Sequence, residues 1–199
     1  LTMKKVSTIT PSYKSEKYLK GFLSSVAKQT YKNIEIVLDH NEPTDREINT
    51  IKKFNKKYNN IQQTIIEKVD PIGVSMNRCI NKSTGEYLCI WNVDDLRTPN
   101  SIELMANVLD ERKDIDIVIG KYIIVNKFKS KKGNTIDEST RPPQDFMSGM
   151  LLGPFFMFRK KILQETGKFD EQFYSGNDYD LAMRLVRNGN YYFLDEVLG

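Results

Sequence analysis

Residues 85–99 read GEYLCIWNVDDLRTP, and this stretch decides the fold. The unbroken apolar run YLCIW leads directly into NVDD, which contains Asp94 and Asp95. An apolar run of this length with helical patterns on both sides is typical of a central strand in a parallel sheet that is covered on both faces. Ligands of open α/β sheets bind beyond the carboxyl ends of such strands. The acidic pair is therefore predicted to lie at a ligand site.

Asp94 and Asp95 are candidate metal ligands. Two adjacent carboxylates repel each other, so a site that keeps both ionised is expected to hold a cation. Hard oxygen ligands suit Mg²⁺ or Mn²⁺. The alternative is a solvated Asp-Asp turn before a helix that is capped by Thr98 and has Pro99 in its first turn. This stretch alone does not separate the two interpretations.

The composition is that of an ordinary globular protein, with 39% hydrophobic and 28% charged residues in a chain of 199. That length fits one domain with a sizeable core. The chain opens with Leu1 and Thr2 ahead of Met3 and stops after a strand-like run, so we expect a domain cut from a longer protein. The net charge of +4 is spread along the chain except for a cluster at 127–132. A nucleic-acid partner is not expected, since its footprint would be more concentrated.

The cysteines and the hydropathy pattern favour a cytoplasmic location. Cys79 and Cys89 lie in a predicted helix and a predicted strand without metal-ligand spacing, which is typical of small core residues. The most apolar stretch, LLGPFFMF at 151–158, is too short to cross a membrane and contains Gly153 and Pro154. Peripheral association with the inner membrane face through regions outside these residues stays open.

Strands and helices alternate through the first half of the chain. Strands are predicted at 6–10, 34–38, 61–66 and 87–91. Between them, helices begin at Ser15, at Thr44 with Glu47 as a capping box, and at Val74. This rhythm implies right-handed crossovers and an α/β, Rossmann-like fold whose mostly parallel central sheet has helices on both faces. Polar residues that end the strands, such as Ser12 and Asp39, should then converge on one edge.

The second half of the chain follows a looser pattern. A helix after Pro99, a strand at 115–125, a strand at 155–158 and a helix at 159–166 are predicted. Residues 128–144 are polar and lysine-rich, with Gly133 and Asn134 suited to a hairpin tip. We interpret them as an exposed loop rather than a site for an anionic partner. Asn177 and Asp178 open the last helix, which stops at Gly189.

With these strand ends in place, the sequence resembles the family 2 glycosyltransferases, which have the GT-A fold and transfer a sugar from a nucleotide diphosphate donor. Four segments carry the resemblance in the family's order: ITPSYKSEKYL, QTYKNIEIVLDHNEPTD, GVSMNRCINKSTGEYLCIWNVDD and GKFDEQFYSGNDYDLAMRLVRNG. The resemblance implies a single GT-A domain over 1–199, with a nucleotide-binding half at 1–98 and an acceptor-side half at 99–199. It also implies a metal-dependent, inverting transfer from a UDP-sugar to a hydroxyl acceptor, in polysaccharide or surface-glycan synthesis.

Carried over residue by residue, the resemblance places Pro11 and Tyr13 against the base and ribose of the donor. Asp39 would accept a hydrogen bond from the base, and Arg78 would lie near the base and the diphosphate. An aromatic face and an acceptor for an imide N–H suit uracil or thymine. Without the resemblance, Tyr13 would be a packed or partly exposed ring, and Arg78 a surface charge on a helix.

The family's metal motif is usually Asp, any residue, Asp, and here Asn92 stands in its first position. Asn92 can still hydrogen-bond a ribose hydroxyl but supplies no charge. The divalent cation, Mn²⁺ or Mg²⁺, would therefore rest mainly on Asp94, which also binds the nucleotide, with Asp95 close by. His40 and Asn41 stand where the family often has Asp and Gly, and Glu42 lengthens this acidic loop by one residue. His40 is the only histidine of the chain. We expect it to be a loop residue, because no second histidine exists to share a metal site.

Asp178 matches the family's catalytic base. The dipole at a helix amino terminus would keep it ionised, which is the form that a base needs. Its alternative role is a helix cap or first-turn acid. Asp180 is the rival carboxylate, but side chains two residues apart on a helix diverge, so only one should face the acceptor.

Two other functions stay open. Asn92 and the altered acidic loop are compatible with a nucleotide-sugar-binding module of weak catalytic activity. A nucleotidyltransferase would require a Gly-rich phosphate loop after the first strand, and TPSYKSEKY contains none. The acceptor is not legible from the sequence, although the segment 145–158 is expected to shape its pocket.

Overall fold

The computed structural model describes residues 3–130, 132–141, 149–150 and 152–199. Its strands are β1 (Val6–Tyr13), β2 (Ile34–Asn41), β3 (Ile61–Ile66), β4 (Tyr87–Ile90), β5 (Ile117–Val125), β6 (Gly133–Ile136), β7 (Phe156–Arg159) and β8 (Tyr191–Val197). Its helices are α1 (Glu16–Ala27), α2 (Asp45–Tyr58), α3 (Ile72–Lys82), α4 (Ser101–Glu111), α5 (Leu163–Thr166) and α6 (Asn177–Asn188), with short 3-10 turns η1 (Glu138–Thr140) and η3 (Lys160–Ile162).

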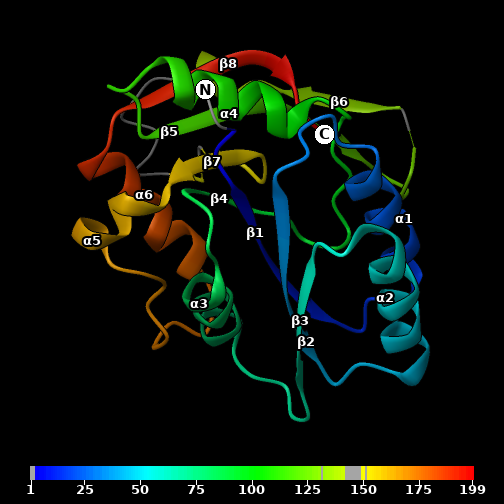
Figure 1. The fold of residues 1–199 in the computed structure, drawn as a ribbon. Helices are drawn as coiled ribbons and strands as arrows, with labels where there is room; N and C mark the ends of the chain where they lie inside the picture. The colour runs from blue at the N-terminus through cyan, green and yellow to red at the C-terminus, as the bar shows by residue number, and fades with distance from the viewer. Residues whose placement is uncertain (1–2, 131, 142–148, 151) are drawn as a thin grey trace.

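The strands form one mixed, mostly parallel sheet in the order β3-β2-β1-β4-β7-β5-β6, with β8 also paired to β5. β1 is the centre of the parallel part, since it pairs with β2 on one side and β4 on the other. β7 runs antiparallel to both β4 and β5 and joins the two halves of the sheet. The predicted α/β fold class is confirmed (Figure 1).

The period-two alternation along the strands builds two separate cores, one on each face of the sheet. In β4, Tyr87 and Cys89 point into the core under α1, α2 and α4, whereas Leu88 and Ile90 point into the core under α3 and α6. Because neighbouring side chains on a strand face opposite ways, a strand that is covered on both faces must be apolar throughout. Figure 1 shows α1 and α2 on the right of the sheet, and α3, α5 and α6 on the left.

Several element boundaries differ from the sequence prediction. β1 and β2 continue past the predicted ends at 10 and 38 and reach Tyr13 and Asn41. The helix after Pro99 is preceded by Asn100 at its N-cap position, so the predicted cap at Thr98 is wrong. The predicted Thr44 capping box is confirmed, with both of its hydrogen bonds to Glu47 present.

The predicted hairpin tip at Gly133 and Asn134 is also wrong. These residues pair with Val125 and Ile124 as part of β6, so the connection between β5 and β6 precedes them. Strand pairing with β5 therefore outweighs the turn preference of this dipeptide. Part of the predicted loop 128–144 and most of the expected acceptor segment from 145 lie outside the described residues.

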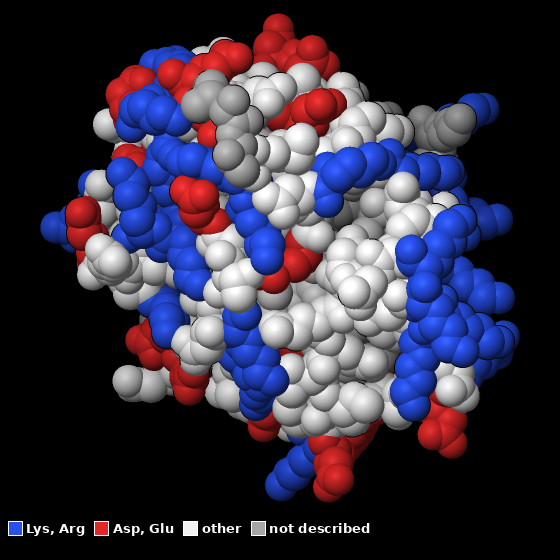
Figure 2. All heavy atoms as spheres, viewed as in Figure 1, with Lys and Arg blue, Asp and Glu red and all other residues white. Residues whose placement is uncertain are grey.

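The outer surface is polar, as the amphipathic helices require. Figure 2 shows Lys and Arg side chains gathered on the side that α1 and α2 cover. The residues responsible are exposed lysines of these helices, among them Lys17, Lys20, Lys52, Lys53, Lys56 and Lys57. Cys79 and Cys89 are both buried and unpaired, as predicted. Among the helices of the described residues, none is both long and apolar enough for a membrane span.

His40 is a strand residue, so its assignment to a loop is wrong. It lies in β2, its side chain is fully buried, and Gln63 Nε2 hydrogen-bonds its Nδ1 at 3.0 Å. Its Nε2 lies 3.6 Å from Glu47 Oε1 and has no hydrogen-bond partner among the described residues. Glu47 also binds Ser15 Oγ at 2.8 Å, which ties the starts of α1 and α2 together around the imidazole. Burial lowers the pKa of His40, and the charge of Glu47 offsets only part of this effect.

We predict that His40 stays neutral in the folded protein at pH 6.5, the ordinary pKa of an exposed imidazole being about 6.5. Because the unfolded chain binds this proton more readily, the contribution of His40 makes the free energy of unfolding fall as the pH drops below about 6.5. The chain has one histidine, so its ring signals in an NMR pH titration report this pKa directly. Urea unfolding of His40→Gln between pH 5.5 and 7.5 should lack this component. A ring pKa at or above 6.5 would contradict the prediction.

Candidate active site

A cleft of about 490 Å³ opens at the carboxyl ends of β1, β2 and β4. Parallel pairing brings these ends together, because Pro11 is in register with Asp39 and Ile9 with Ile90. The cleft walls come from five places: the end of β1, the first turn of α1, the end of β2, the start of α3 with the loop before it, and the loop after β4. Its lining residues are Pro11, Ser12, Tyr13, Tyr18, Asn41, Val69, Asp70, Ile72, Ser75, Asn92, Val93 and Asp94.

Some of the predicted site residues line the cleft, and others lie beneath it or outside it. Those that line the cleft are Pro11, Tyr13, Asn92 and Asp94. Tyr13 is 44% exposed, so its ring is free to contact a ligand. Asp39 and Arg78 do not line the cleft but contact residues that do. Asp95 and Asp178 also lie outside the lining.

Asp39 lies beneath the cleft, with its side chain only 1% exposed. Its carboxylate accepts hydrogen bonds from Ser75 Oγ at 2.6 Å, from Asn41 Nδ2 at 3.2 Å and from Arg78 Nη1 at 2.7 Å. A buried carboxylate needs such partners because an uncompensated charge is very costly in the interior. Asn41 and Ser75 are cleft residues, so Asp39 acts on the cleft surface through them in this conformation.

Arg78 joins Asp39 to the rim of the cleft. Its guanidinium binds both oxygens of Asp39 and also the carboxylate of Asp70, a lining residue. Asp70 N in turn donates to Asn41 Oδ1 at 3.1 Å. The hydrogen bonds that Arg78 donates to Asp39 and then to Asp70 raise its pKa above the ordinary value, so it stays charged. The arginine is therefore a fixed positive charge at the base of the cleft wall.

The loop after β4 presents one exposed acid, Asp94, and one half-buried acid, Asp95. Asp94 is exposed in the cleft, while Asp95 is turned inward, where Asn92 Nδ2 donates to its Oδ2 at 3.3 Å. Burial and then the charge of Asp94 raise the pKa of Asp95 to about 6. Among the described residues, no group of three or more His, Cys, Asp or Glu side chains is placed to hold a metal ion.

Arg97 lies behind this loop and is a site residue that the sequence prediction missed. It is 6% exposed, donates to Ile90 O at 2.9 Å and stacks on Trp91 at 5.2 Å from the ring centroid. Its positive charge lowers the pKa of Asp95 and so opposes the effect of burial. Its Nε has no hydrogen-bond partner among the described residues. An isolated arginine in a loop shows no periodicity, so no sequence signal marked it.

Asp178 lies in the first turn of α6 and is exposed, as its alternative role as a first-turn acid would also allow. The preceding residue, Asn177, is buried against α3, since a Cβ on Gly73 would lie 2.9 Å from Asn177 Nδ2. Gly73 follows Ile72, which lines the cleft. The start of α6 therefore adjoins the cleft through the start of α3. Asp180 is paired with Arg184, Oδ2 lying 3.1 Å from Nε.

Two residues that follow the strand ends have unusual backbone conformations. Lys14 after β1 has φ of 50°, and Glu42 after β2 has φ of 43°. Positive φ is uncommon for residues other than glycine, and such strain gathers at functional sites. Both turns reverse the chain directly beside cleft residues, Tyr13 and Asn41. The extra residue in the acidic loop is therefore accommodated by a left-handed turn.

The remaining missed residues carried weak signals. Ser75 precedes Arg78 by three positions on α3, so the two share a helix face, and this spacing could have indicated it. Tyr18 belongs to the apolar pattern of α1 but also lines the cleft. Asn41 was seen only as a departure from the family pattern, although its amide binds Asp39, Ser75 and Asp70.

The sequence matches the profile of glycosyl transferase family 2 over residues 7–167. The chain belongs to this family. It is 26% identical over 189 residues to the Uncharacterized glycosyltransferase MJ1057 of Methanocaldococcus jannaschii, covering 92% of this chain and 65% of that protein. Over 117 residues it is 33% identical to glycosyltransferase GlyG of Streptococcus pneumoniae, covering 59% of this chain and 38% of that protein.

Solved structures of glycosyltransferases share the fold. S. aureus TarS 1-349 in complex with UDP-GlcNAc has a TM-score of 0.82 at 22% identity, covering 98% of this chain and 57% of that chain. The mannosyltransferase PcManGT of Pyrobaculum calidifontis, in complex with GDP-Man and Mn²⁺, has a TM-score of 0.69 at 15% identity, covering 98% and 56%. The family 2 resemblance and the GT-A fold are therefore confirmed. The chain spans 65% of its relative MJ1057 and 33% of the Rickettsia conorii glycosyltransferase RC0461.

Removing the guanidinium of Arg78 should destabilise this family 2 domain. In Arg78→Met the buried Asp39 keeps Ser75 and Asn41 but loses its charged partner, which we expect to lower the free energy of unfolding by about 2–3 kcal/mol. Urea unfolding at pH 7.5 measures this loss. Lys82→Met is the matched control, one turn further along α3, where the lysine is exposed and its Nζ donates to Thr64 Oγ1. Equal small losses in both variants would contradict the role given to Arg78.

Proposed function

We propose that this family 2 domain is a metal-dependent, inverting glycosyltransferase that moves a sugar from a UDP-sugar donor to a hydroxyl acceptor. One observation carries the proposal. The cleft at the carboxyl edge of β1, β2 and β4 combines an exposed aromatic residue, Tyr13 at the end of β1, with an exposed acid, Asp94 in the loop after the neighbouring strand β4. The first suits a base or ribose, and the second suits a diphosphate held through a cation.

The charged layer beneath the cleft supports a nucleotide ligand. Arg78 supplies a permanent positive charge, and Asp39 supplies a carboxylate that a donor base could reach if the side chains of Asn41 or Ser75 move. S. aureus TarS, which shares the fold, has been solved in complex with UDP and with UDP-GlcNAc. We infer a uridine nucleotide for this chain because an acceptor for an imide N–H favours uracil.

The donor set at the end of β4 fits a divalent cation. Burial and the charge of Asp94 both disfavour the ionised form of Asp95, and a dication beside the two acids would favour it. Asp94 would hold the ion, with Asp95 close by, and Asn92 would contact the ribose. When bound, the ion would neutralise negative charge that develops on the leaving diphosphate. PcManGT, a neighbour in fold, has been solved with Mn²⁺.

Asp178 is the residue that we propose as the catalytic base. It lies in the first turn of α6, and its carboxylate is exposed rather than paired with an arginine as Asp180 is. In this role it removes the proton of the acceptor hydroxyl, whose oxygen attacks the anomeric carbon from the face opposite the nucleotide. The C–O bond to the diphosphate then breaks, and the configuration inverts.

The same proposal covers the two halves of the domain, its cellular location and its biosynthetic role. Residues 1–98 contribute most of the cleft and form the nucleotide-binding half, and residues 99–199 contribute Asp178 and form the acceptor-side half. The buried, unpaired cysteines support a cytoplasmic location. Polysaccharide or surface-glycan synthesis is the role that the family resemblance favours.

The donor and the metal can be identified together. We expect UDP with Mn²⁺ to raise the melting temperature more than GDP, ADP or CDP with Mn²⁺, and more than UDP with EDTA, since binding to the folded state stabilises it. Thermal-shift measurements with each nucleotide provide the test, and UMP tests the contribution of the second phosphate. An equal response to all bases, or no response to Mn²⁺, would contradict the assigned donor site.

The proposed roles of Asp178 and Asp94 predict that their variants affect different steps, sugar transfer and UDP binding. Asp178→Asn should lower the rate of sugar transfer by about 10²–10⁴-fold and leave UDP binding within about twofold, because it removes only base catalysis. Asp94→Ala should weaken UDP binding in the presence of Mn²⁺ but not in EDTA. Asp180→Asn is the control for Asp178 on the same helix turn. If Asp178→Asn transfers sugar normally, the base is another group.

The transfer assay also separates the second candidate function. Asn92 removes one charge from the usual metal motif, which favours weak chemistry. UDP binding and slow hydrolysis of UDP-GlcNAc by the wild-type protein, without transfer to any acceptor in a broad panel, would support a nucleotide-sugar-binding module instead.

A further inference from the structure

The molecule contains a second cavity, which the proposed reaction does not use. It has a volume of about 720 Å³ and lies where β4 begins and β7 ends. β4 runs from Tyr87 in this cavity to the loop that carries Asn92 in the cleft. α3 runs between the same two places, with Ile72 at the cleft and Ile80 at the cavity. The cavity is therefore at the opposite edge of the sheet from the candidate active site.

The side chains around this cavity are strongly basic. Its lining includes five cationic residues and one acid, Glu86; the cationic residues are Lys4, Arg159, Lys160, Lys161 and Lys168. Two of these lysines already form ion pairs with acidic residues. Lys4 Nζ lies 3.1 Å from Glu86 Oε2, and Lys161 Nζ lies 3.8 Å from Asp116 Oδ1.

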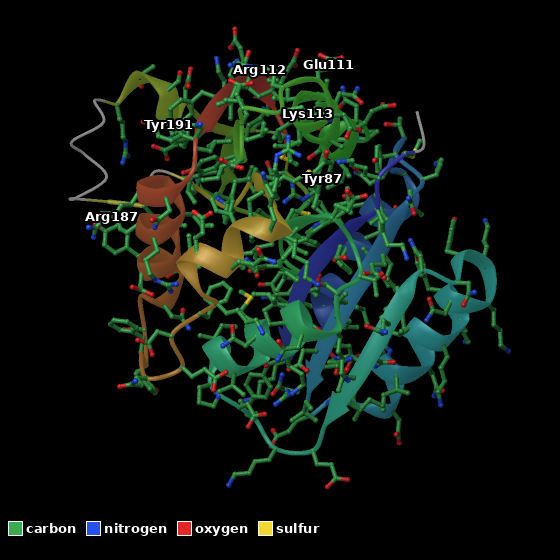
Figure 3. All side chains as sticks on the ribbon, turned by 60° about the vertical axis from the view of Figure 1, so that its left-hand side comes forward. Tyr87, Glu111, Arg112, Lys113, Arg187 and Tyr191 are labelled. Atoms are coloured by element: carbon green, nitrogen blue, oxygen red, sulfur yellow. The ribbon has the colours of Figure 1, made fainter. Side chains whose placement is uncertain are left out.

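Arg159 also has a structural role. It is 6% exposed, and its guanidinium donates to Ile115 O at 2.8 Å and to the carbonyls of Leu109 and Arg112. These are carbonyls at and after the end of α4, so Arg159 joins that helix to β7. In Figure 3, Tyr87 lies near Arg112 and Lys113 at this end of α4, which agrees with the bond from Tyr87 Oη to Asp110 at 2.6 Å.

Lys160 and Lys168 are different, because their partners are neutral. Lys160 Nζ donates to Ser83 O at 2.5 Å, and Lys168 Nζ donates to Asn81 Oδ1. Neither forms an ion pair with any residue in the part of the chain that the structure describes. Burial lowers the pKa of Lys160, the charge of Glu35 partly opposes this effect, and Lys168 lowers the pKa further. The two lysines line the same cavity, and among the described residues neither has a carboxylate within ion-pair distance.

One wall of the cavity is apolar. Ile80, Leu163 and Tyr87 are among its lining residues, and Asn81 and Gln164 add amide groups. Ile80 and Tyr87 are buried in the protein core, so this wall is rigid. Concave sites with apolar walls and a few convergent polar groups are typical of small-molecule binding sites. An inorganic anion alone would fill only a small part of the volume.

We propose that this cavity binds a phosphate monoester, with Lys160 and Lys168 holding the phosphate and the half-buried Leu163, on the apolar wall, contacting its organic part. A phosphate monoester carries close to two negative charges at pH 7.5, which matches two lysines that have no acidic partner. Lysine binds phosphate as a point charge and needs no bidentate geometry. The site is separate from the cleft, so the proposal does not depend on the donor or on the reaction.

Phenyl phosphate is a suitable probe, because its ring models the organic part of the ligand. In ¹H–¹⁵N NMR titrations at pH 7.5 and constant ionic strength, we expect shifts of the Gly85 amide and of neighbouring cavity residues. Lys160→Gln/Lys168→Gln should weaken binding at least about tenfold, since both charge-assisted contacts are lost. Lys52→Gln/Lys53→Gln, which removes the same charge from α2, should change it less than about twofold. Lys160→Arg keeps the charge and should retain binding.

The controls separate the cavity from other sources of phosphate binding. Inorganic phosphate should bind more weakly than phenyl phosphate, and phenol should not bind. Saturating UDP with Mn²⁺ should leave the Gly85 shift in place. Equal binding by both double lysine variants, or shifts confined to Asn92 and its neighbours, would overturn the proposal. Binding to phosphatidylcholine vesicles that contain phosphatidic acid, without binding of phenyl phosphate, would also overturn it and assign these lysines to a lipid surface.

Discussion

The parallel pairing of β1 with both β2 and β4 is the constraint on which the rest of the site depends. It places the ends of three strands at one edge, so residues 11–13, Asn41 and residues 92–94 meet around one cleft. Each strand must be covered on both faces, and two cores meet this need. The crossover helices that supply the cores also bring Ser75 and Arg78 to the same edge. Fold and site thus follow from one pairing pattern.

Charge balance beneath the cleft imposes a second constraint. A carboxylate as deeply buried as Asp39 is stable only with a charged partner and additional hydrogen bonds. Arg78 is that partner, and its Nη2 donates a hydrogen bond to Asp70 at the rim of the cleft. The pair therefore links the stability of the parallel sheet to the electrostatic character of the ligand site. A similar relation holds at the end of β4, where Arg97 compensates part of the charge of Asp95.

β4 and α3 each connect two concave regions at opposite edges of the sheet. At one end stand the residues that suit a nucleotide and a metal ion, and at the other stand lysines without acidic partners. The order of strands explains this arrangement. β7 returns antiparallel to β4, so its own carboxyl end, with the basic segment that follows, lies beside the amino end of β4. A purely parallel sheet would not bring Arg159 and Lys160 to that position.

Periodicity and capping in the sequence determined the α/β class, the first four strands and the Thr44 capping box, because these depend on neighbouring residues alone. The meeting of the strand ends around one cleft was also predictable, since the carboxyl ends of parallel strands lie at the same edge of a sheet. Only the tertiary structure decided which predicted residues reach the cleft. Asp39 is buried behind Asn41 and Ser75, and His40 is a core residue, because β2 continues three residues beyond its apolar run. Gly133 and Asn134 became strand for a similar reason: pairing with β5 supplies hydrogen bonds that a local turn preference cannot anticipate.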